Sequence, residues 1–287
     1  MTGEALALVI GAAMLHAVWN ALAKGARDQL VFLWSSVSLA TVILLPVGLL
    51  ALPGERIPAA AVPFVVATIA IHAVYFYALG RAYRHGDFSR VYPIARGLGV
   101  ALVPVVALMV FGERLSPLGT TGIALVVAGV AGLHLTAPWR GGALPPASGA
   151  GTAWALLTGL LIASYSIVDK AGVARLHPLP YIGLMGLGMS ALLVPVVLRN
   201  RAALAREWRE NWQTIVVASA MNLTSYLLVL FAFRLSKVGY VVAARELSIL
   251  FSAFIGSLWL GEGPLLPRLT GASIVLAGVV CARSRIN

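Results

Sequence analysis

The sequence predicts an all-α polytopic membrane protein in which ten transmembrane helices form two inverted five-helix repeats. Three observations support this prediction: the chain is 60% hydrophobic and 11% charged, its apolar segments match the length of a membrane-spanning helix, and its two halves share short motifs. An ordinary soluble domain has about 25% charged and about 45–50% apolar residues. A soluble protein as apolar as this chain would expose large hydrophobic patches and aggregate. The composition therefore excludes a soluble enzyme.

Ten apolar segments are long enough to cross a membrane, because a helix spans the hydrocarbon core with about 20 residues. Ser116 and Pro117 supply an N-cap and a first-turn proline for the fifth segment. The predicted spans are residues 5–23, 30–52, 59–80, 91–111, 116–136, 150–170, 178–198, 214–235, 238–260 and 265–283.

The net charge of +11 does not indicate a nucleic-acid partner, because Lys and Arg are scattered between apolar segments. Short cytoplasmic loops of membrane proteins collect these residues. Of the 21 Lys and Arg residues, Arg96 and Arg245 lie within spans, and the others divide 11 to 8 between the two faces of the membrane. The larger number lies opposite the chain termini, so the count leans slightly towards termini outside the cell.

The two halves of the chain share motifs at an offset of 149 residues. The sequence FGE at 111–113 matches LGE at 260–262, and Arg96 matches Arg245. A five-span unit followed by its own copy must insert the copy upside down, because five is an odd number. Many secondary transporters build two gates around one central site in this way. The expected domains are a first repeat at 1–137, a linker rich in Pro and Gly at 138–149 and a second repeat at 150–287.

These paired halves resemble the drug/metabolite transporter superfamily, and specifically proteins with two EamA repeats. The motifs that carry the resemblance are FGERLSP at 111–117 and LGEGPLLP at 260–267. The segment HAVWNALAKGARD at 16–28 is similar to a subset of EamA-like proteins, some loosely associated with phosphonate utilisation. The resemblance implies a multi-pass protein of the inner membrane with both termini in the cytoplasm. It also implies a pocket between spans 1, 3 and 4 of one half and 6, 8 and 9 of the other.

Charged side chains within spans are costly and are therefore candidates for function. Arg96 and Arg245 lie at matching depths in the fourth and ninth spans, and Glu246 follows Arg245 directly. If the repeats are inverted, both arginines converge on one cavity, where a guanidinium can bind a carboxylate, phosphate or phosphonate with two hydrogen bonds. The alternative is that Arg245 pairs with Glu246 or another helix, and that Arg96 extends to the membrane interface.

Polar and aromatic side chains share one face of the first span and recur in the sixth span. His16, Trp19 and Asn20 have helical spacing, and Tyr165 and Ser166 match Trp19 and Asn20 at an offset of 146. We expect these groups to face a pocket, because hydrocarbon penalises exposed polar groups. The alternative for Asn20 is a hydrogen bond between helices.

The third and eighth spans carry further candidates for binding, namely Tyr75, Asn222 and Tyr226. Tyrosine combines a ring with a hydroxyl and suits an amphipathic metabolite. The alternative is that the rings pack and their hydroxyls bond to neighbouring helices. His16 and His72 could carry protons, although a lone intramembrane histidine is more often a packing residue. No metal-ligand spacing joins the histidines, so we expect neither a metal nor a cofactor.

Three further features predict how the helices pack. Glu113 and Glu262 follow helix C-termini, and we expect each carboxylate to cap the next helix along the chain. Residues 199–212 alternate Arg and Glu and resemble a short helix on the membrane surface. Glycines seven residues apart give the fifth and tenth spans a small-residue face, which permits close packing within the chain or a homodimer. These glycines are at positions 122 and 129 and at 271 and 278.

The chain contains no Gly-rich phosphate loop, G-x-S-x-G or HExxH motif. The predicted function is a secondary transporter that exports a small polar or amphipathic metabolite, anionic or zwitterionic, by alternating access. An amino acid, organic acid or phosphonate fits this description. Any proton coupling would use Glu246, Asp169 or a histidine. The alternatives are a membrane enzyme for lipid-linked substrates, which needs an acid–base or metal cluster, and a non-transporting scaffold with a dry, packed centre.

Overall fold

The structure is a computed structural model that describes residues 1–23, 25–50, 56–85, 88–135, 149–255 and 273–281. All regular secondary structure in these residues is helical. Seven of the described helices are long and apolar enough to cross a membrane, which confirms an all-α polytopic membrane fold. The helices are α1 (Gly3–Ala23), α2 (Gln29–Leu50), the 3₁₀ helix η2 (Ala59–Ala61), α3 (Val62–His85), α4 (Phe88–Phe111), α5 (Pro117–Leu135), α6 (Gly149–Val173), α7 (Pro178–Leu198), α8 (Arg201–Leu235), α9 (Val238–Arg245), α10 (Leu247–Phe254) and an unlabelled helix at 273–281.

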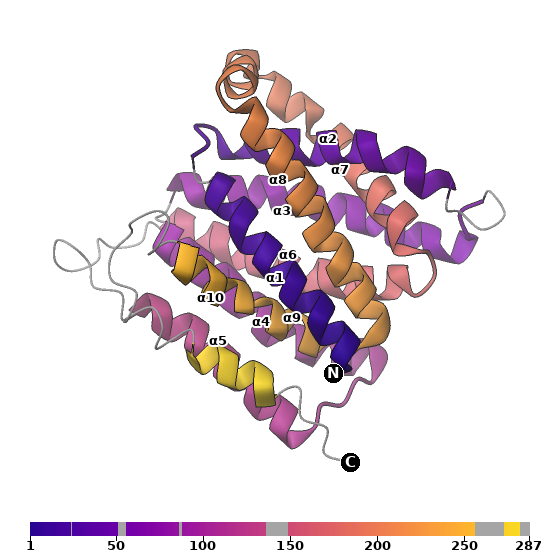
Figure 1. Cartoon of the computed structure of the whole chain (residues 1–287), viewed down its shortest axis with the longest axis vertical. Coiled ribbons are helices and arrows are strands. Elements are labelled where there is room, and N and C mark those ends of the chain that lie inside the picture. Colours follow the sequence, from indigo (N-terminus) through magenta and orange to yellow (C-terminus); the bar gives the residue numbers. More distant parts are fainter. Residues whose placement is uncertain (24, 51–55, 86–87, 136–148, 256–272, 282–287) are drawn as a thin grey trace.

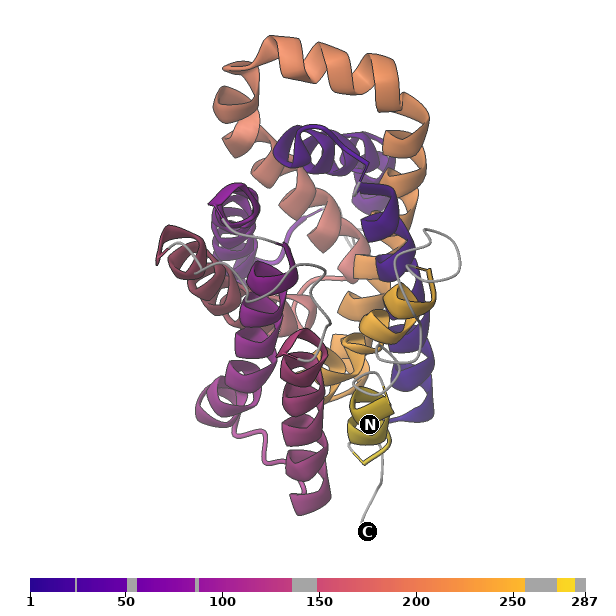
Figure 2. The ribbon, with the colours of Figure 1, turned by 90° about the vertical axis from the view of Figure 1, so that its left-hand side faces the viewer.

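The predicted surface segment forms the first part of α8. Asn211 departs from helical geometry with φ −125° and ψ 17°, so the helix turns there. Figure 2 shows that the segment before this turn lies across one end of the bundle. The buried Glu207 fixes it in place, because its Oε1 accepts hydrogen bonds from the backbone N–H groups of Arg27 and Asp28 at 2.7 and 2.9 Å. The carboxylate therefore connects α8 to the start of α2.

The predicted ninth span, 238–260, is not one continuous helix. It is divided into α9 and α10 by a turn at Glu246. The backbone N–H of Glu246 bonds to the carbonyl of Ala243 at 3.1 Å, three residues back, which tightens the helix locally. No proline or glycine marks this turn, so hydropathy and helix-breaking residues could not predict it.

The helices pack in a two-fold pattern (Figure 1). Helix α1 lies along α8 and against α9 and α10, whereas α6 lies along α3 and α4. Helix α2 packs against α7. If each helix of the first half is exchanged with its counterpart in the second half, this set of contacts is unchanged. An inverted duplication predicts such a pattern. The proposed boundaries remain a prediction, and most of the linker at 138–149 lies outside the described residues.

Individual contacts give the directions of the helices. Ser225 donates to the carbonyl of Ala12 at 2.8 Å, and Leu228 lies beside Gly11, so α8 runs antiparallel to α1. Lys170, near the end of α6, donates to the carbonyl of Ser236 at the end of α8 at 2.8 Å. The C-terminal ends of α6 and α8 therefore lie together. It follows that α6 runs antiparallel to α1, its counterpart in the other half.

Small residues bring α5 close to the helix at 273–281. A side-chain carbon at Gly278 would lie 2.5 Å from the carbonyl oxygen of Gly122, and both glycines are buried. Contact at this distance is possible only for glycine. This pair packs two helices within one chain. The homodimer through the same helices remains a prediction, and Gly271 lies outside the described residues.

Candidate functional site

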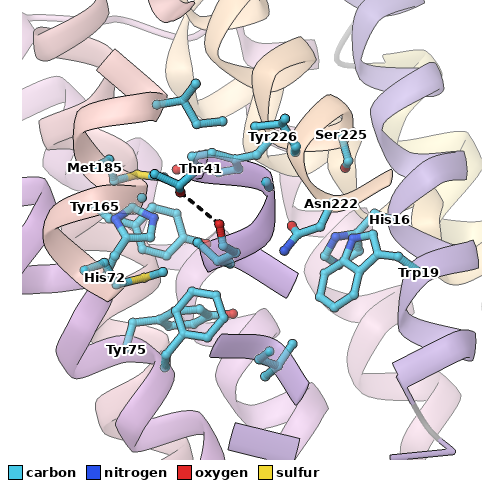
Figure 3. Close-up of a pocket in the computed structure, with 18 of the residues that line it drawn as sticks. His16, Trp19, Thr41, His72, Tyr75, Tyr165, Met185, Asn222, Ser225 and Tyr226 are labelled. Carbon is cyan, nitrogen blue, oxygen red and sulfur yellow. Dashed lines mark hydrogen bonds between the residues drawn. The ribbon is translucent and has the colours of Figure 1, made fainter. Parts of the chain in front are cut away.

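A cavity of about 90 Å³ lies between the two halves of the chain (Figure 3). One water molecule needs about 10–15 Å³ on this scale, so the cavity has room for several waters or part of a small metabolite. Its lining comes from α1, α2 and α3 in the first half and from α6, α7, α8 and α9 in the second. A wall shared by both halves is the place where a central transport site is expected.

One side of the cavity carries polar groups that can bind a ligand. His16 and Trp19 of α1 lie edge to face, with ring centroids 5.1 Å apart. The indole N–H of Trp19 is buried and has no hydrogen-bond partner within the described part of the chain. Asn222 of α8 lies next to these two side chains (Figure 3). An orphaned buried donor at a cavity wall marks a place where a water or ligand can accept a hydrogen bond.

Arg245 brings a positive charge to the cavity wall. It is the last residue of α9 and is 7% exposed. Its guanidinium carbon lies 5.6 Å from the ring centroid of Tyr226. None of the ion pairs among the described residues includes Arg245. A guanidinium in this situation favours an anion in the cavity.

The opposite side of the cavity is aromatic. His72 stacks on Tyr165 with ring centroids 4.5 Å apart and an interplanar angle of 29°. Tyr75 meets Tyr165 edge to face at 5.4 Å, and Tyr226 meets His72 at 5.6 Å. These rings form a surface against which an apolar or aromatic part of a ligand can pack.

A buried carboxylate lies behind the aromatic side. Asp169 of α6 has no exposed surface and accepts hydrogen bonds from Thr68 at 2.5 Å, from Tyr181 at 2.8 Å and from Tyr226. The Nε2 atom of His72 lies 4.0 Å from Asp169 Oδ2. Asp169 is thus connected to the cavity through Tyr226 and His72, which both line it.

The neighbouring Lys170 does not pair with Asp169. Its ammonium group donates to the backbone carbonyls of Phe233 and Ser236 at the end of α8. Glu113 Oε1 lies 3.9 Å from the same ammonium group. The lysine therefore stabilises the end of α8, and Asp169 depends on neutral hydroxyl groups for its hydrogen bonds.

Arg96 and Glu246 pair with each other and do not line the cavity. The Arg96 Nη2 atom lies 2.5 Å from Glu246 Oε1, and Nε lies 3.3 Å from Oε2. Arg96 and Glu246 are 6% and 1% exposed. The two predicted arginines therefore do not converge on one cavity, because Arg96 binds the carboxylate beside Arg245.

The other predicted residues form two groups: those that bond within their own helix and those that line the cavity. Asn20 Nδ2 donates to the carbonyl of His16, and Ser166 Oγ donates to that of Ile162, each at 2.7 Å. Each side chain bonds within its own helix, and neither Asn20 nor Ser166 is part of the cavity lining. The predicted residues that do line it are His16, Trp19, Tyr75, Tyr165, Asn222, Tyr226 and Arg245.

The cavity lining also includes His72, Thr41 and Ser225, which are not among the predicted binding residues. The sequence leaves His72 open as a proton carrier or a packing residue, and its position three residues before Tyr75 on the same helix is a signal that it shares a face with Tyr75. Thr41 lies in an apolar span without any charged or repeated neighbour, so no sequence signal marked it. Among the described residues, no three His, Cys, Asp or Glu side chains are arranged to hold a metal ion.

Glu113 caps a different helix from the one predicted. Its Oε2 accepts the backbone N–H of Val238 at 2.9 Å, at the start of α9. The next helix, α5, is capped instead by Ser116, whose Oγ accepts the N–H of Gly119 at 3.0 Å. The prediction was wrong because α9 begins beside the end of α4 in space. Glu262 lies outside the described residues.

Three comparisons place this architecture among known proteins. The model of the EamA-like transporter family matches residues 149–284, and that of the Small Multidrug Resistance protein matches residues 32–126. The multidrug transporter PA4990 of Pseudomonas aeruginosa is 49% identical over 45 residues, which are 16% of this chain and 41% of that protein. A solved crystal structure with 17% identity matches 99% of this chain and 97% of its own, with a TM-score of 0.78. At that identity the likeness shows the fold alone.

The apolar helices are those of a multi-pass membrane protein, and the family matches support a membrane transporter. The two family matches support the EamA type of the drug/metabolite transporter superfamily, with the EamA-like model covering slightly less than half of the chain. The family matches point to a transporter rather than an enzyme.

Proposed function

We propose that this chain is a secondary transporter that exports a small amphipathic metabolite with an anionic or zwitterionic group across the inner membrane. The observation that carries the proposal is Arg245, a buried guanidinium on the cavity wall that takes part in no ion pair among the described residues. Arginine remains charged under all physiological conditions and binds a carboxylate, phosphate or phosphonate with two hydrogen bonds.

The two sides of the cavity suit the two ends of such a substrate. The acidic group would lie at Arg245, within reach of the amide of Asn222. The orphaned indole N–H of Trp19 would donate to a polar group of the substrate. The apolar part would pack against Tyr75 and Tyr165 on the other side. A mostly apolar pocket with a few convergent polar groups is typical of small-molecule sites.

Alternating access follows from the two-fold packing of the helices. A cavity at the interface of two inverted repeats can open to either side of the membrane if one half rocks against the other. The packing of α1 on α8 and of α6 on α3 supports this proposal, since exchange of the halves exchanges these contacts. The cavity also disfavours the alternative of a scaffold with a dry, packed centre.

We further propose that transport is coupled to protons through Asp169 and His72. Of the acidic candidates, Glu246 is bonded to a guanidinium, whereas Asp169 is bonded to hydroxyl groups. A buried carboxylate without a cationic partner is unfavourable unless it shares a proton with a neighbour. His72, at 4.0 Å, is that neighbour and lines the cavity.

A second candidate function is efflux of lipophilic compounds. The aromatic side of the cavity supports it, as does the match to a multidrug transporter. Such compounds would need no anionic group. A cationic compound would be disfavoured beside Arg245, so the charge of the best ligand distinguishes the two candidates.

The substitution Arg245→Gln tests the proposed function. Purified protein would be screened by thermal shift against amino acids, organic acids, phosphonates and nucleosides, and affinity would be measured for the best ligand. Because a hydrogen bond to a charged group contributes about 1.5–3 kcal/mol, we expect affinity to fall by about 10- to 150-fold. Proteoliposome transport should fall with it.

The matched control is Arg234→Gln, at the exposed end of α8, which should leave affinity unchanged. Equal binding by the wild-type protein and Arg245→Gln would contradict the proposal, as would stabilisation by neutral or cationic compounds alone.

A further inference from the structure

Three charged side chains meet where α4 passes the turn between α9 and α10. Arg245 ends α9 and lines the cavity, and Glu246 occupies the turn directly after it. Both Arg245 and Arg96 act electrostatically on the Glu246 carboxylate. Among the side chains that the structure describes, Arg96 alone is hydrogen-bonded to this carboxylate, at 2.5 Å from Nη2 and 3.3 Å from Nε. This contact uses both carboxylate oxygens, which is the arrangement in which arginine binds a carboxylate most strongly.

The charge that the cavity presents depends on how Glu246 is neutralised. A carboxylate adjacent in sequence to Arg245 would cancel much of that guanidinium's attraction for an anion, because charges interact strongly in a protein interior. In the described structure Arg96 bonds to Glu246 from α4, a helix that contributes no residue to the described cavity lining. Arg245 is left facing the ring of Tyr226 and the cavity.

We propose that Arg96 is a positioning residue that neutralises Glu246 and so keeps the cavity at Arg245 selective for anions. Arg96 does not touch the ligand. It acts across the interface between the halves, since it lies on α4 and its partner follows α9. The inference rests on the proposed function in one respect: the anion selected is the acidic group of the transported metabolite.

The charge in the cavity can be measured without knowledge of the substrate. The free Cys281 is first replaced by serine, and Asn222→Cys places a single thiol on the cavity lining. Two methanethiosulfonate reagents then compete for this thiol: the anionic sulfonatoethyl reagent and the cationic trimethylammonium-ethyl reagent. The ratio of their rate constants, divided by the same ratio for 2-mercaptoethanol, reports the sign of the local charge. Thr41→Cys, elsewhere on the lining, is a second reporter.

We expect the parent protein to favour the anionic reagent by about tenfold or more. Arg96→Gln should lower the ratio by at least about tenfold, because Glu246 is then no longer neutralised. Glu246→Gln should raise the ratio. The double substitution Arg96→Gln/Glu246→Gln removes both charges and should restore the parental ratio.

The matched control is the exposed pair Arg27–Glu210, whose ion-pair distance is 2.9 Å. Replacement of both residues by Gln should leave the ratio unchanged. A pair with a purely structural role would affect folding but leave the ratio equal in every variant. That result would overturn the inference, as would a double variant with a ratio as low as that of Arg96→Gln.

Arg96→Gln leaves a buried carboxylate unpaired, which can prevent folding. If this variant is not recovered as a monodisperse protein, the reagent ratios of Glu246→Gln and of the double variant test the inference instead. A raised ratio in the first and a parental ratio in the second support the inference, and parental ratios in both overturn it. If the pattern of ratios holds but no anionic metabolite binds, the proposed function fails while the role of Arg96 stands.

Discussion

Two buried carboxylates in this protein differ in their partners, and this difference separates their roles. Glu246 is bonded to the guanidinium of Arg96. Asp169 is bonded to Thr68, Tyr181 and Tyr226, and none of these groups is a cation. Hydroxyl donors stabilise an ionised carboxylate less than a guanidinium does. Asp169 is therefore the carboxylate that we propose for proton coupling.

At this scale we predict that Asp169→Asn abolishes the response of transport to a pH gradient. The amide keeps the size of the carboxylate but carries no exchangeable charge, so exchange without a gradient should continue. The measurement is substrate flux in proteoliposomes with and without an imposed gradient. Glu207→Gln is the control, because Glu207 is equally buried but caps the start of α2. A gradient response that survives in Asp169→Asn would exclude this role.

At the scale of the helices, side chains at helix ends tie one half of the chain to the other. Glu113, after α4, accepts the N–H of Val238 at the start of α9. Glu207, in the first part of α8, accepts two N–H groups before α2. A carboxylate is favourable at a helix N-terminus, where backbone N–H groups lack partners. These contacts hold the helices in place on both sides of the cavity.

Loss of the Glu113 cap should destabilise the protein. We predict that Glu113→Ala lowers stability by about 0.5–2 kcal/mol, whereas Glu113→Gln keeps an oxygen that accepts the Val238 N–H. Thermal unfolding in detergent checks the difference. Equal melting temperatures for the wild-type protein and Glu113→Ala would show that the cap contributes nothing.

The same residue gives a pH dependence with a definite sign. Desolvation raises the pKa of Glu113, and the nearby charge of Lys170 and the Val238 N–H only partly oppose this. The folded protein therefore holds the proton more tightly than the unfolded chain does. This contribution to stability is present below the ordinary pKa of glutamate and is lost as pH rises through the raised value. The melting temperature of the wild-type protein, relative to Glu113→Gln, should accordingly fall as pH rises through that range.

At the scale of the whole molecule, the two-fold packing places the cavity between the halves and the connections on two opposite faces. Arg175, in the connection after α6, and Arg201, at the start of α8, are separated by the span of α7. We predict that an impermeant maleimide labels Arg201→Cys in intact cells and does not label Arg175→Cys, with Cys281→Ser as the parent. This expectation follows the family orientation. Labelling of Arg175→Cys alone would favour the orientation that the Lys and Arg count suggests.

Much of this architecture could be predicted from the sequence, because the bilayer sets the length of a span and polar groups avoid hydrocarbon. The same two rules selected His16, Trp19 and Tyr226, which do line the cavity. These rules did not predict the turn at Glu246. The turn depends on one local hydrogen bond, from the backbone N–H of Glu246 to the carbonyl three residues before it. The rules also placed Asn20 in the pocket, where a bond to its own helix instead satisfies the side chain.

By itself, the sequence determined the membrane class, the approximate ends of the spans in the described part of the chain, and the charged residues within them. Only the tertiary structure decided which charges are neutralised. Arg96 and Glu246 are 150 positions apart in the chain, and Glu113 caps a helix 125 positions away. Hydropathy is a property of one segment, whereas these bonds depend on which helices are neighbours and how their side chains are directed. The packing of α4 against α9 and the turn at Glu246 therefore leaves Arg245 as the charge that faces the cavity.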